Sequence, residues 1–238
     1  MSKPTTDSDQ RRIWSHFQNR AVGTFDASLP RLDFILKRIA RRADTTSPQI
    51  LNVGIGNGHL ERTAKDRGWF IHSLDPDTEA SLRLKSYGIP SHIGTVDQIP
   101  LPDATFDFVV ASEVLEHLSD RDRRLGLGEI ARVLKPSAWF LGTVPFGEDL
   151  AAGQTVCPKC GEVFHRWGHK KSFDLEELRS ELTPLFQIVE FRRTAFVTFR
   201  GQSVPAKFKS LVRLVLAKQG QMIAVPTIYW CARRRASY

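Results

Sequence analysis

A glycine-rich turn and the acid that follows it constrain the fold of this chain more than any other feature. Residues 51–53 are typical of the end of a buried strand, and Gly54, Gly56 and Gly58 follow at alternate positions. A second apolar run ends in Asp75. In a βαβ unit such a turn lets the backbone approach an adenosine, and the acid accepts the ribose hydroxyls. The pattern therefore predicts a nucleoside pocket at the carboxyl edge of a parallel sheet.

The glycine spacing bears on which nucleoside is bound. Dinucleotide folds use G-x-G-x-x-G/A, which needs a small third residue where this chain has His59. The spacing here is G-x-G-x-G. It leaves three interpretations: an S-adenosylmethionine (SAM) loop, a loop for another nucleotide, or a turn with only a structural role.

The remaining elements alternate between strand and helix. Apolar runs predict core strands at 49–53, 69–75, 90–94, 106–111 and 139–144, with helices at 58–67, 77–87 and 121–134. Helical spacing also covers 13–43, whereas residues 1–12 are polar and predict disorder. This order predicts an α/β fold with a parallel sheet and helices on both faces.

Length and composition restrict the class of protein. A chain of 238 residues suits one elaborated α/β domain. It has no apolar run of membrane-spanning length, and its first residues lack the apolar segment of a secretory signal. Three cysteines, two of them in a CxxC pair, argue against a disulfide framework and favour a reducing compartment. We therefore expect a cytoplasmic protein.

The charge is unevenly distributed along the chain. The net charge is +8, yet residues 51–190 contain 15 Lys/Arg against 21 Asp/Glu. Residues 191–238 contain 10 Lys/Arg and no acid. This asymmetry predicts either an anionic partner near the C-terminus, such as a substrate, a membrane surface or a nucleic acid, or a basic surface that only aids solubility.

Three later segments carry a family resemblance. They are I-P-L-P-D-A-T-F-D-F-V-V at 99–110, E-V-L-E-H-L at 113–118 and E-I-A-R-V-L-K-P at 129–136. With the glycine turn, they resemble the type 11 small-molecule group of class I SAM-dependent methyltransferases. The resemblance implies a Rossmann-like, mostly parallel seven-stranded sheet with an antiparallel last strand. It also implies a helical cap at 1–45 and a SAM-binding domain at 46–238.

The resemblance implies a set of cofactor-binding residues. The set is Gly54, Gly56, Gly58, Asp75 and Pro76 around the ribose, Val96 at the adenine, Ser112 beside the methionine, and Arg31 at the SAM carboxylate. Two acids usual in the family are absent, because Asn52 and Thr95 stand in their places. Their loss motivates the alternative of a non-catalytic SAM-binding partner module.

The segment after the fourth strand carries the candidate catalytic groups. If it is helical, Glu113, Glu116 and His117 share one face. His117 would be the general base with Glu113 beside it. Similar E-x-x-E-H sets, completed by a later histidine, bind Mg²⁺ in quinone-pathway O-methyltransferases and small-RNA 2′-O-methyltransferases. A third interpretation gives these residues only a local structural role.

An insertion at 155–171 contains four candidate zinc ligands. Cys157 and Cys160 form a CxxC pair, and His165 and His169 follow at helical spacing. Such a set predicts a compact structural Zn²⁺ knuckle, with a redox dithiol or unmetallated cysteines as alternatives. His169 also aligns with the later histidine of the E-x-x-E-H enzymes, and one histidine cannot easily serve both sites.

The C-terminal third predicts a helix at 174–183 and strands at 186–193 and 227–234. Between the strands, 204–220 predicts a basic amphipathic helix, whose core 205–219 would bind an anionic membrane, cap the acceptor site or pack on the domain.

The sequence as a whole predicts a SAM-dependent methyltransferase, with O-methylation of a small, lipid-linked or saccharide acceptor. A metal-dependent RNA 2′-O-methyltransferase is the catalytic alternative, although no aromatic and basic platform for nucleic acid is evident. The acceptor itself cannot be read from a class I sequence. The location would then be cytoplasmic, with membrane-peripheral binding if the basic helix serves that purpose.

Overall fold

The structure is a computed structural model that describes residues 7–20, 25–196 and 226–236, together with 205, 208, 211 and 212. The elements run in the order α1 (Asp7–Asn19), η1 (Asp26–Ser28), α2 (Leu29–Arg42), β1 (Gln49–Val53), α3 (His59–Asp66), β2 (Phe70–Asp75), α4 (Thr78–Ser86), β3 (Ser91–Ile93), β4 (Phe106–Ser112), η2 (Leu115–His117), α5 (Asp120–Val133), β5 (Leu134–Pro145), β6 (Gln154–Val156), β7 (Val163–His165), α6 (Leu175–Leu182), β8 (Phe186–Thr194) and β9 (Thr227–Arg234).

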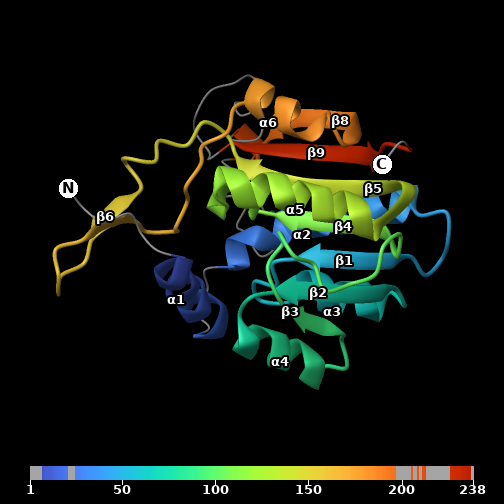
Figure 1. Ribbon diagram of the computed structural model, residues 1–238, viewed down its shortest axis with the longest axis horizontal. Coiled ribbons are helices and arrows are strands. Elements are labelled where there is room, and N and C mark those ends of the chain that lie inside the picture. The colour runs from blue at the N-terminus through green and yellow to red at the C-terminus, as the bar shows by residue number, and fades with distance from the viewer. Residues whose placement is uncertain are drawn as a thin grey trace.

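One seven-stranded sheet organises the molecule (Figure 1). Its strand order is β3-β2-β1-β4-β5-β9-β8. The strands from β3 to β5 pair in parallel, and β9 runs antiparallel to both β5 and β8. The predicted mostly parallel sheet with an antiparallel last strand is confirmed.

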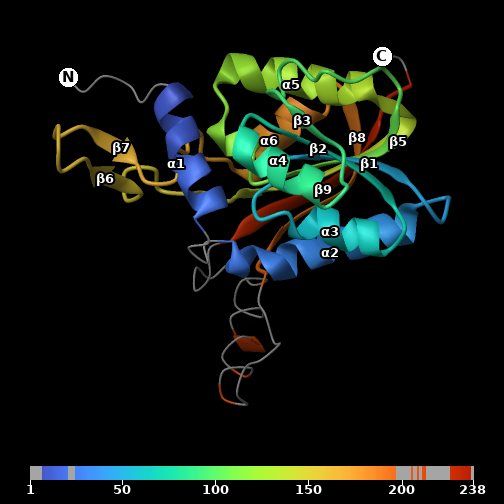
Figure 2. The same ribbon diagram turned by 90° about the horizontal axis from the view of Figure 1, so that it is seen from below.

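Helices cover both faces of the sheet, as the sequence predicts. Figure 2 shows α2 and α3 along one face and α5 along the other. β4 lies in the middle and is buried on both sides, so its apolar side chains alternate between two clusters. Phe108 and Val110 pack with α2 and α3, whereas Val109 and Ala111 pack with α5. The continuous apolar run at 106–111 is explained by this double burial.

Two local predictions need correction. The segment with Glu113, Glu116 and His117 is not an α-helix: Glu113 has φ +59°, and a 3₁₀ turn, η2, follows it. The strand predicted at 139–144 begins earlier, because β5 takes over directly from α5 at Leu134.

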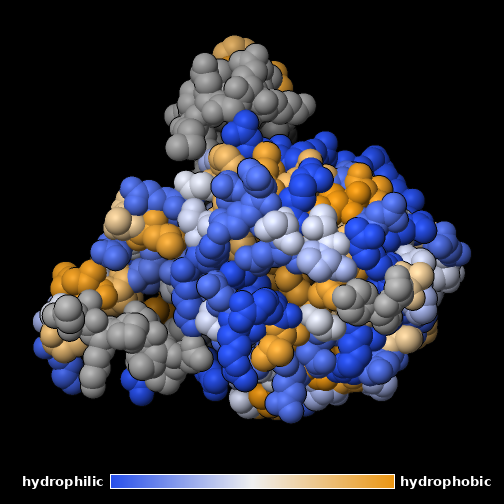
Figure 3. Space-filling view, turned by 45° about the horizontal axis from the view of Figure 1, so that its top comes forward, coloured by the Kyte–Doolittle hydropathy of each residue, from blue (hydrophilic) through white to orange (hydrophobic). Residues whose placement is uncertain are grey.

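A β-hairpin formed by β6 and β7 is inserted between β5 and α6 (Figures 1 and 2). It extends beyond the sheet, and Val156 and Val163 near its tip are exposed. The described surface in Figure 3 is mostly hydrophilic with separate hydrophobic patches, one of them on the projecting part at the left.

Most of the basic helix predicted at 204–220 lies outside the described residues. The four residues described there, Pro205, Phe208, Leu211 and Val212, are helical and exposed. None of the helices in the described part of the chain is long and apolar enough to cross a bilayer.

Candidate active site

A cavity of about 1030 Å³ opens at the carboxyl ends of β1, β2 and β4. It joins the two halves of the predicted site, because it contacts both the glycine turn and the segment after β4. The predicted site residues that line it are Arg31, Gly54, Gly56, Asp75, Pro76, Val96, Ser112, Glu113, His117 and His169. Gly58, Cys157, Cys160 and His165 are not among its lining residues.

The glycine turn has the backbone conformation that its sequence predicts. Gly54, Gly56 and Gly58 all have positive φ, between 55° and 86°. A side chain at Gly56 would lie 3.1 Å from the Phe25 ring, besides being strained by the backbone angle. The turn therefore brings bare backbone to the cavity wall.

Asp75, at the end of β2, is buried and holds this turn in place. Its Oδ2 accepts the backbone N–H of Ile55 at 2.8 Å and the side-chain amide of Gln18 at 2.9 Å. Its Oδ1 accepts the backbone N–H of Asp77 at 2.8 Å. Burial raises the pKa of the Asp75 carboxyl, and the hydrogen bonds from these donors oppose that rise. The acid predicted to bind ribose thus also fixes the first residues of the glycine loop.

A carboxylate that the sequence reasoning missed lies under the turn. Asn52, which replaces the usual acid, donates from Nδ2 to the backbone carbonyl of Gly54 at 2.8 Å and to Glu61 Oε1 at 2.7 Å. Ser73 also donates to Glu61 Oε1, at 2.9 Å. Glu61 is completely buried. The burial of Glu61 could have been predicted from the sequence, because Glu61 lies on the inner side of α3 between the apolar residues Leu60 and Ala64.

Arg31 reaches from α2 to the end of β4. Its Nε donates to Ser112 Oγ at 3.0 Å, and its Nη1 lies 3.8 Å from Glu113 Oε2. Ser112 Oγ also lies 2.9 Å from the hydroxyl of Thr143. Because Glu113 has a left-handed backbone, its side chain turns from the strand end into the cavity that Arg31 lines.

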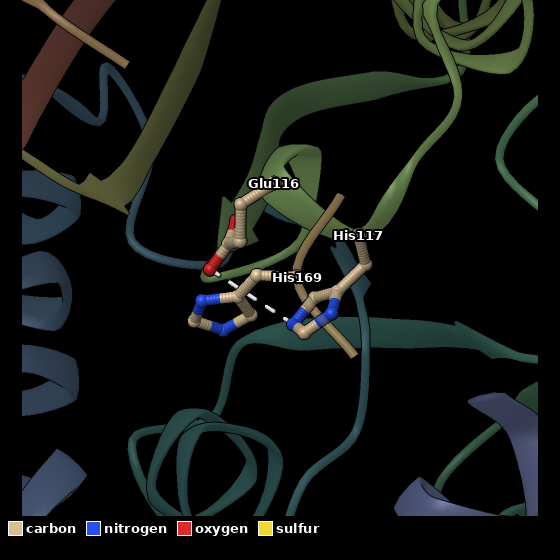
Figure 4. Close-up of side chains that lie close together, drawn as sticks. All are labelled: Glu116, His117 and His169. Carbon is tan, nitrogen blue, oxygen red and sulfur yellow. Dashed lines mark ion pairs between the residues drawn. The ribbon is translucent and has the colours of Figure 1, made fainter. Parts of the chain in front are cut away.

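Three side chains converge on one point beyond Glu113. Atoms of Glu116, His117 and His169 that could ligate a metal all lie within 4.8 Å of one another. Figure 4 shows Glu116 and His117 pointing toward each other, with His169 beside them. Glu116 Oε1 lies 3.9 Å from His117 Nε2. The structure thus brings together residues that are far apart in the sequence.

The electrostatics of this group fit a cation. Glu116 is completely buried, and neither of its carboxylate oxygens has a hydrogen-bond partner among the described residues. Burial and the nearby Glu113 hold its pKa well above the usual range. Burial and His169 lower the pKa of His117 to about 3, so this imidazole is neutral at ordinary pH. A buried, unpartnered carboxyl beside the neutral imidazole of His117 and the ring of His169 is a donor set suited to a divalent metal ion.

The four predicted zinc ligands do not come together. Among the described residues, His165 and His169 form a group with Glu148, and neither group of candidate metal ligands contains a cysteine. The hairpin register explains the separation, because His165 pairs with Gln154 whereas the strand pairing toward the tip ends at Val156 and Val163. Cys157 and Cys160 lie beyond that last pair, at the hairpin tip. The described side chains are not gathered as one Cys₂His₂ set, and the zinc site at Cys157, Cys160, His165 and His169 stays a prediction.

The helix α1 covers both halves of the cavity. Arg83 of α4 donates to the Gln18 carbonyl at 3.1 Å and to Asn19 Oδ1 at 2.7 Å. The Trp14 ring meets the His117 ring edge to face, with centroids 4.8 Å apart. The helix therefore contacts the region of Asp75 and the region of His117 at once.

Comparison with known proteins gives relatives for this arrangement. The profile of the methyltransferase domain family matches residues 51–142. Malonyl-[acyl-carrier protein] O-methyltransferase of Serratia marcescens is 29% identical over 189 residues, which cover 78% of this chain and 67% of that protein. An uncharacterized methyltransferase of Mycobacterium bovis is 31% identical over 134 residues, which cover 53% of this chain and 51% of that protein. The chain thus spans about half the length of this second relative.

Solved structures share the fold at lower identity. A chain in the complex between the Haloferax volcanii Trm112 methyltransferase activator and a methyltransferase has a TM-score of 0.68 and 18% identity. The alignment covers 98% of this chain and 99% of that one. The 1,6-didemethyltoxoflavin-N1-methyltransferase of Burkholderia thailandensis has a TM-score of 0.65 and 16% identity, covering 95% and 87%. The family profile over residues 51–142, the sequence relatives and the fold together support a class I SAM-dependent methyltransferase.

Proposed function

We propose that the protein transfers the methyl group of SAM to an oxygen atom of a small, lipid-linked or saccharide acceptor. One observation carries this proposal. The same cavity contacts the glycine turn with Asp75 at one end and Glu113, His117 and His169 at the other. Methyl transfer is an in-line displacement, so catalysis depends chiefly on holding cofactor and acceptor together in one pocket.

The cofactor half of the proposal assigns each lining residue a role. The ribose hydroxyls would bind Asp75 beside Pro76, where the Gln18 amide now donates. The turn from Gly54 to Gly58 would face the methionine part of SAM together with Ser112. Arg31 would pair with its carboxylate, and Val96 would cover the adenine. Glu61 holds the glycine turn in place through Asn52. This contact favours SAM binding although Asn52 stands where the family usually has an acid.

The acceptor half of the proposal changes the role of His117. An imidazole with a pKa of about 3 is a weak proton acceptor at neutral pH, so general-base catalysis by His117 is disfavoured. Glu116, His117 and His169 would instead hold a divalent metal ion, which when bound acidifies an acceptor hydroxyl. Glu113 would accept the proton that leaves. Two imidazoles in the set favour Mn²⁺ or Fe²⁺ over Mg²⁺.

Two accessory features belong to the same proposal. A Zn²⁺ ion at Cys157 and Cys160 would stiffen the hairpin tip. The segment 205–219 would hold the protein against an anionic membrane that carries the acceptor, and the exposed apolar side chains of Phe208 and Leu211 support this placement.

The test begins with cofactor binding. We expect the full chain to bind SAM in calorimetric titration and Asp75→Ala to reduce the affinity at least about a hundredfold. This loss reflects a charged hydrogen-bonding group that binds the ligand and orders the loop. Asp103→Ala, an exposed change outside the cavity, is the matched control.

Activity is then measured with radiolabelled SAM on fractionated cell extract, with and without EDTA. Label in an ester or ether product would support O-methylation. SAM binding without transfer to any fraction would favour the non-catalytic module, and label confined to RNA would favour the RNA 2′-O-methyltransferase. Unchanged SAM affinity in Asp75→Ala would overturn the site assignment.

A further inference from the structure

Glu148 lies just past β5 and faces the candidate metal ligands from the outer side. Its Oε2 forms a short hydrogen bond with Nδ1 of His169, and its Oε1 lies 3.4 Å from Nε2 of His165. The rings of His165 and His169 stack with centroids 4.8 Å apart and planes 20° apart. Glu148 thus contacts both imidazoles, through a hydrogen bond with His169 and an ion-pair contact with His165, behind the metal-ligand group.

Backbone groups determine which nitrogen of His165 carries the proton. The Nδ1 atom accepts the backbone N–H of Trp167 at 3.3 Å and that of His169 at 3.1 Å. An imidazole nitrogen that accepts is unprotonated, so the proton of neutral His165 is on Nε2, directed at Glu148. This nitrogen lies 3.4 Å from one carboxylate oxygen of Glu148. The other accepts from His169 Nδ1, which therefore carries the proton of that ring.

The consequence concerns the opposite side of the His169 ring. With Nδ1 protonated, its Nε2 has the lone pair that a metal ion needs. His117 follows the same logic, because its Nδ1 lies 3.3 Å from the carbonyl oxygen of Gly168 and donates to it. The inserted segment is held against η2, since the backbone N–H groups of Lys170 and Lys171 donate to the Glu116 carbonyl at 2.8 and 3.1 Å.

We infer that Glu148, flanked by His165, fixes His169 in the tautomer whose Nε2 has the lone pair to join Glu116 and His117 in holding a metal ion, and so builds a site selective for an imidazole-preferring divalent metal ion over Mg²⁺. The inference rests on the proposed function, which places the metal at this group. Glu148 and His165 are positioning residues and not ligands. The alternative, in which Glu148, His165 and His169 bind a second ion, requires His165 Nε2 to lose the proton that its neighbours place there.

The test is metal binding by the full chain in a Cys157→Ser/Cys160→Ser background, so that the thiols do not contribute. After EDTA treatment, Mn²⁺ and Mg²⁺ are titrated by calorimetry, and the Mn²⁺ environment is followed by electron paramagnetic resonance. We expect one Mn²⁺ per chain, bound at least about tenfold more tightly than Mg²⁺. Glu148→Ala should weaken Mn²⁺ binding about 10–100-fold, as loss of a carboxylate partner does at other metal-bound histidines.

Control variants show whether a loss of Mn²⁺ affinity comes from the orientation of His169, from misfolding of the chain or from a change in SAM binding. Glu162→Ala changes a partly exposed acid of the same hairpin, outside both groups of candidate metal ligands, and should leave Mn²⁺ affinity unchanged. Glu148→Gln keeps an acceptor for His169 and should lose less affinity than Glu148→Ala. SAM affinity within about threefold of wild type would show that each variant is folded.

Each other outcome is decisive. Wild-type Mn²⁺ affinity in Glu148→Ala would overturn the positioning role and leave the metal site standing. Two ions per chain would favour the second-ion alternative and overturn the inference. No Mn²⁺ binding by the parent would overturn the inference and the metal part of the proposed function, whereas SAM binding and methyl transfer are measured separately and would stand.

Discussion

At the scale of single residues, Asn52 and Glu61 show how a buried carboxylate is connected to the glycine turn. Glu61 of α3 accepts a hydrogen bond from Asn52 at the end of β1, and the same Asn52 amide donates to the Gly54 carbonyl. The amide both donates to the acid and holds the turn. We therefore expect the stability of the glycine loop to depend on the protonation of Glu61.

Glu61→Gln tests this dependence through pH. Burial raises the pKa of Glu61 above its ordinary value near 4.5, so the folded chain holds this proton more tightly than the unfolded chain. That contribution to stability is complete below about pH 4.5 and is lost as the pH rises through the folded pKa. Glutamine keeps an acceptor for Asn52 but cannot ionise.

Melting curves from pH 4.5 to 7.5 provide the measurement. We expect wild type to lose about 2–4 °C in Tm relative to Glu61→Gln over this range, which is the effect of ~1 kcal/mol in a domain of this size. The exposed change Glu79→Gln should follow wild type. Parallel curves for wild type and Glu61→Gln would show that Glu61 does not titrate differently in the folded state.

The sequence predicted the cofactor side of the cavity better than the acceptor side, for a physical reason. The glycines and Asp75 are set by local chain geometry, so a short motif carries them. Glu148 meets His169 only because an inserted hairpin folds back on η2, a contact that no periodicity records. Its position directly after a strand end at the carboxyl edge was the available signal.

At the scale of elements, α1 depends on α4 for its place over the cavity. Arg83 donates to the Gln18 carbonyl and to Asn19 Oδ1, and its third donor reaches the Gly56 carbonyl at 3.0 Å. One guanidinium therefore holds both the helix and the glycine loop.

Arg83→Ala should release α1. Each lost hydrogen bond contributes about 1 kcal/mol, so we expect backbone amide exchange in 11–19 to accelerate at least about tenfold in a hydrogen–deuterium exchange experiment. The exposed change Arg124→Ala on α5 should leave these amides as in wild type. Equal protection in Arg83→Ala would mean that α1 is held by its other contacts, such as that between Trp14 and His117.

The boundaries of helices and strands were predictable where a local sequence feature, such as an apolar run or a helix-capping residue, sets them. The strand at 106–111 follows from an apolar run that only Asp107 interrupts, and α5 begins after Ser119, whose hydroxyl accepts the Asp122 N–H. The α-helix considered as one possibility after β4 does not form, because the left-handed backbone at Glu113 turns the chain and only the 3₁₀ turn η2 follows. The i, i+3, i+4 spacing of Glu113, Glu116 and His117 carries no information about the turn at Glu113.

At the scale of the whole molecule, the charged residues are unevenly divided between the C-terminal stretch of the sequence and the part before it. The 10 basic residues and no acid of 191–238 contrast with the acidic excess of 51–190. Phe208, Leu211 and Val212 belong to this basic stretch of the sequence and are exposed. The exposed fraction of Phe208 is 68%. Exposed apolar residues among lysines and arginines favour an anionic lipid surface.

Flotation with vesicles containing phosphatidylglycerol measures this attraction. We expect the full chain to float with the vesicles at low salt and to be released at about 0.5 M salt, because screening shortens the reach of the charges. Phe208→Glu should reduce flotation severalfold, whereas Leu125→Glu, an exposed change on α5, should not. No flotation at low salt would exclude the membrane role.

The position of α1 has a further consequence for turnover. Gln18 donates to the carboxylate of Asp75 while Trp14 packs on His117, so one helix contacts both ends of the cavity. If SAM binds at Asp75 and the acceptor binds near His117, as proposed, exchange of spent cofactor and access of a new acceptor would depend on the same movement of this helix. In such an arrangement, we expect the speed of the catalytic cycle to be set by how often that helix opens and not by the bond-making step itself.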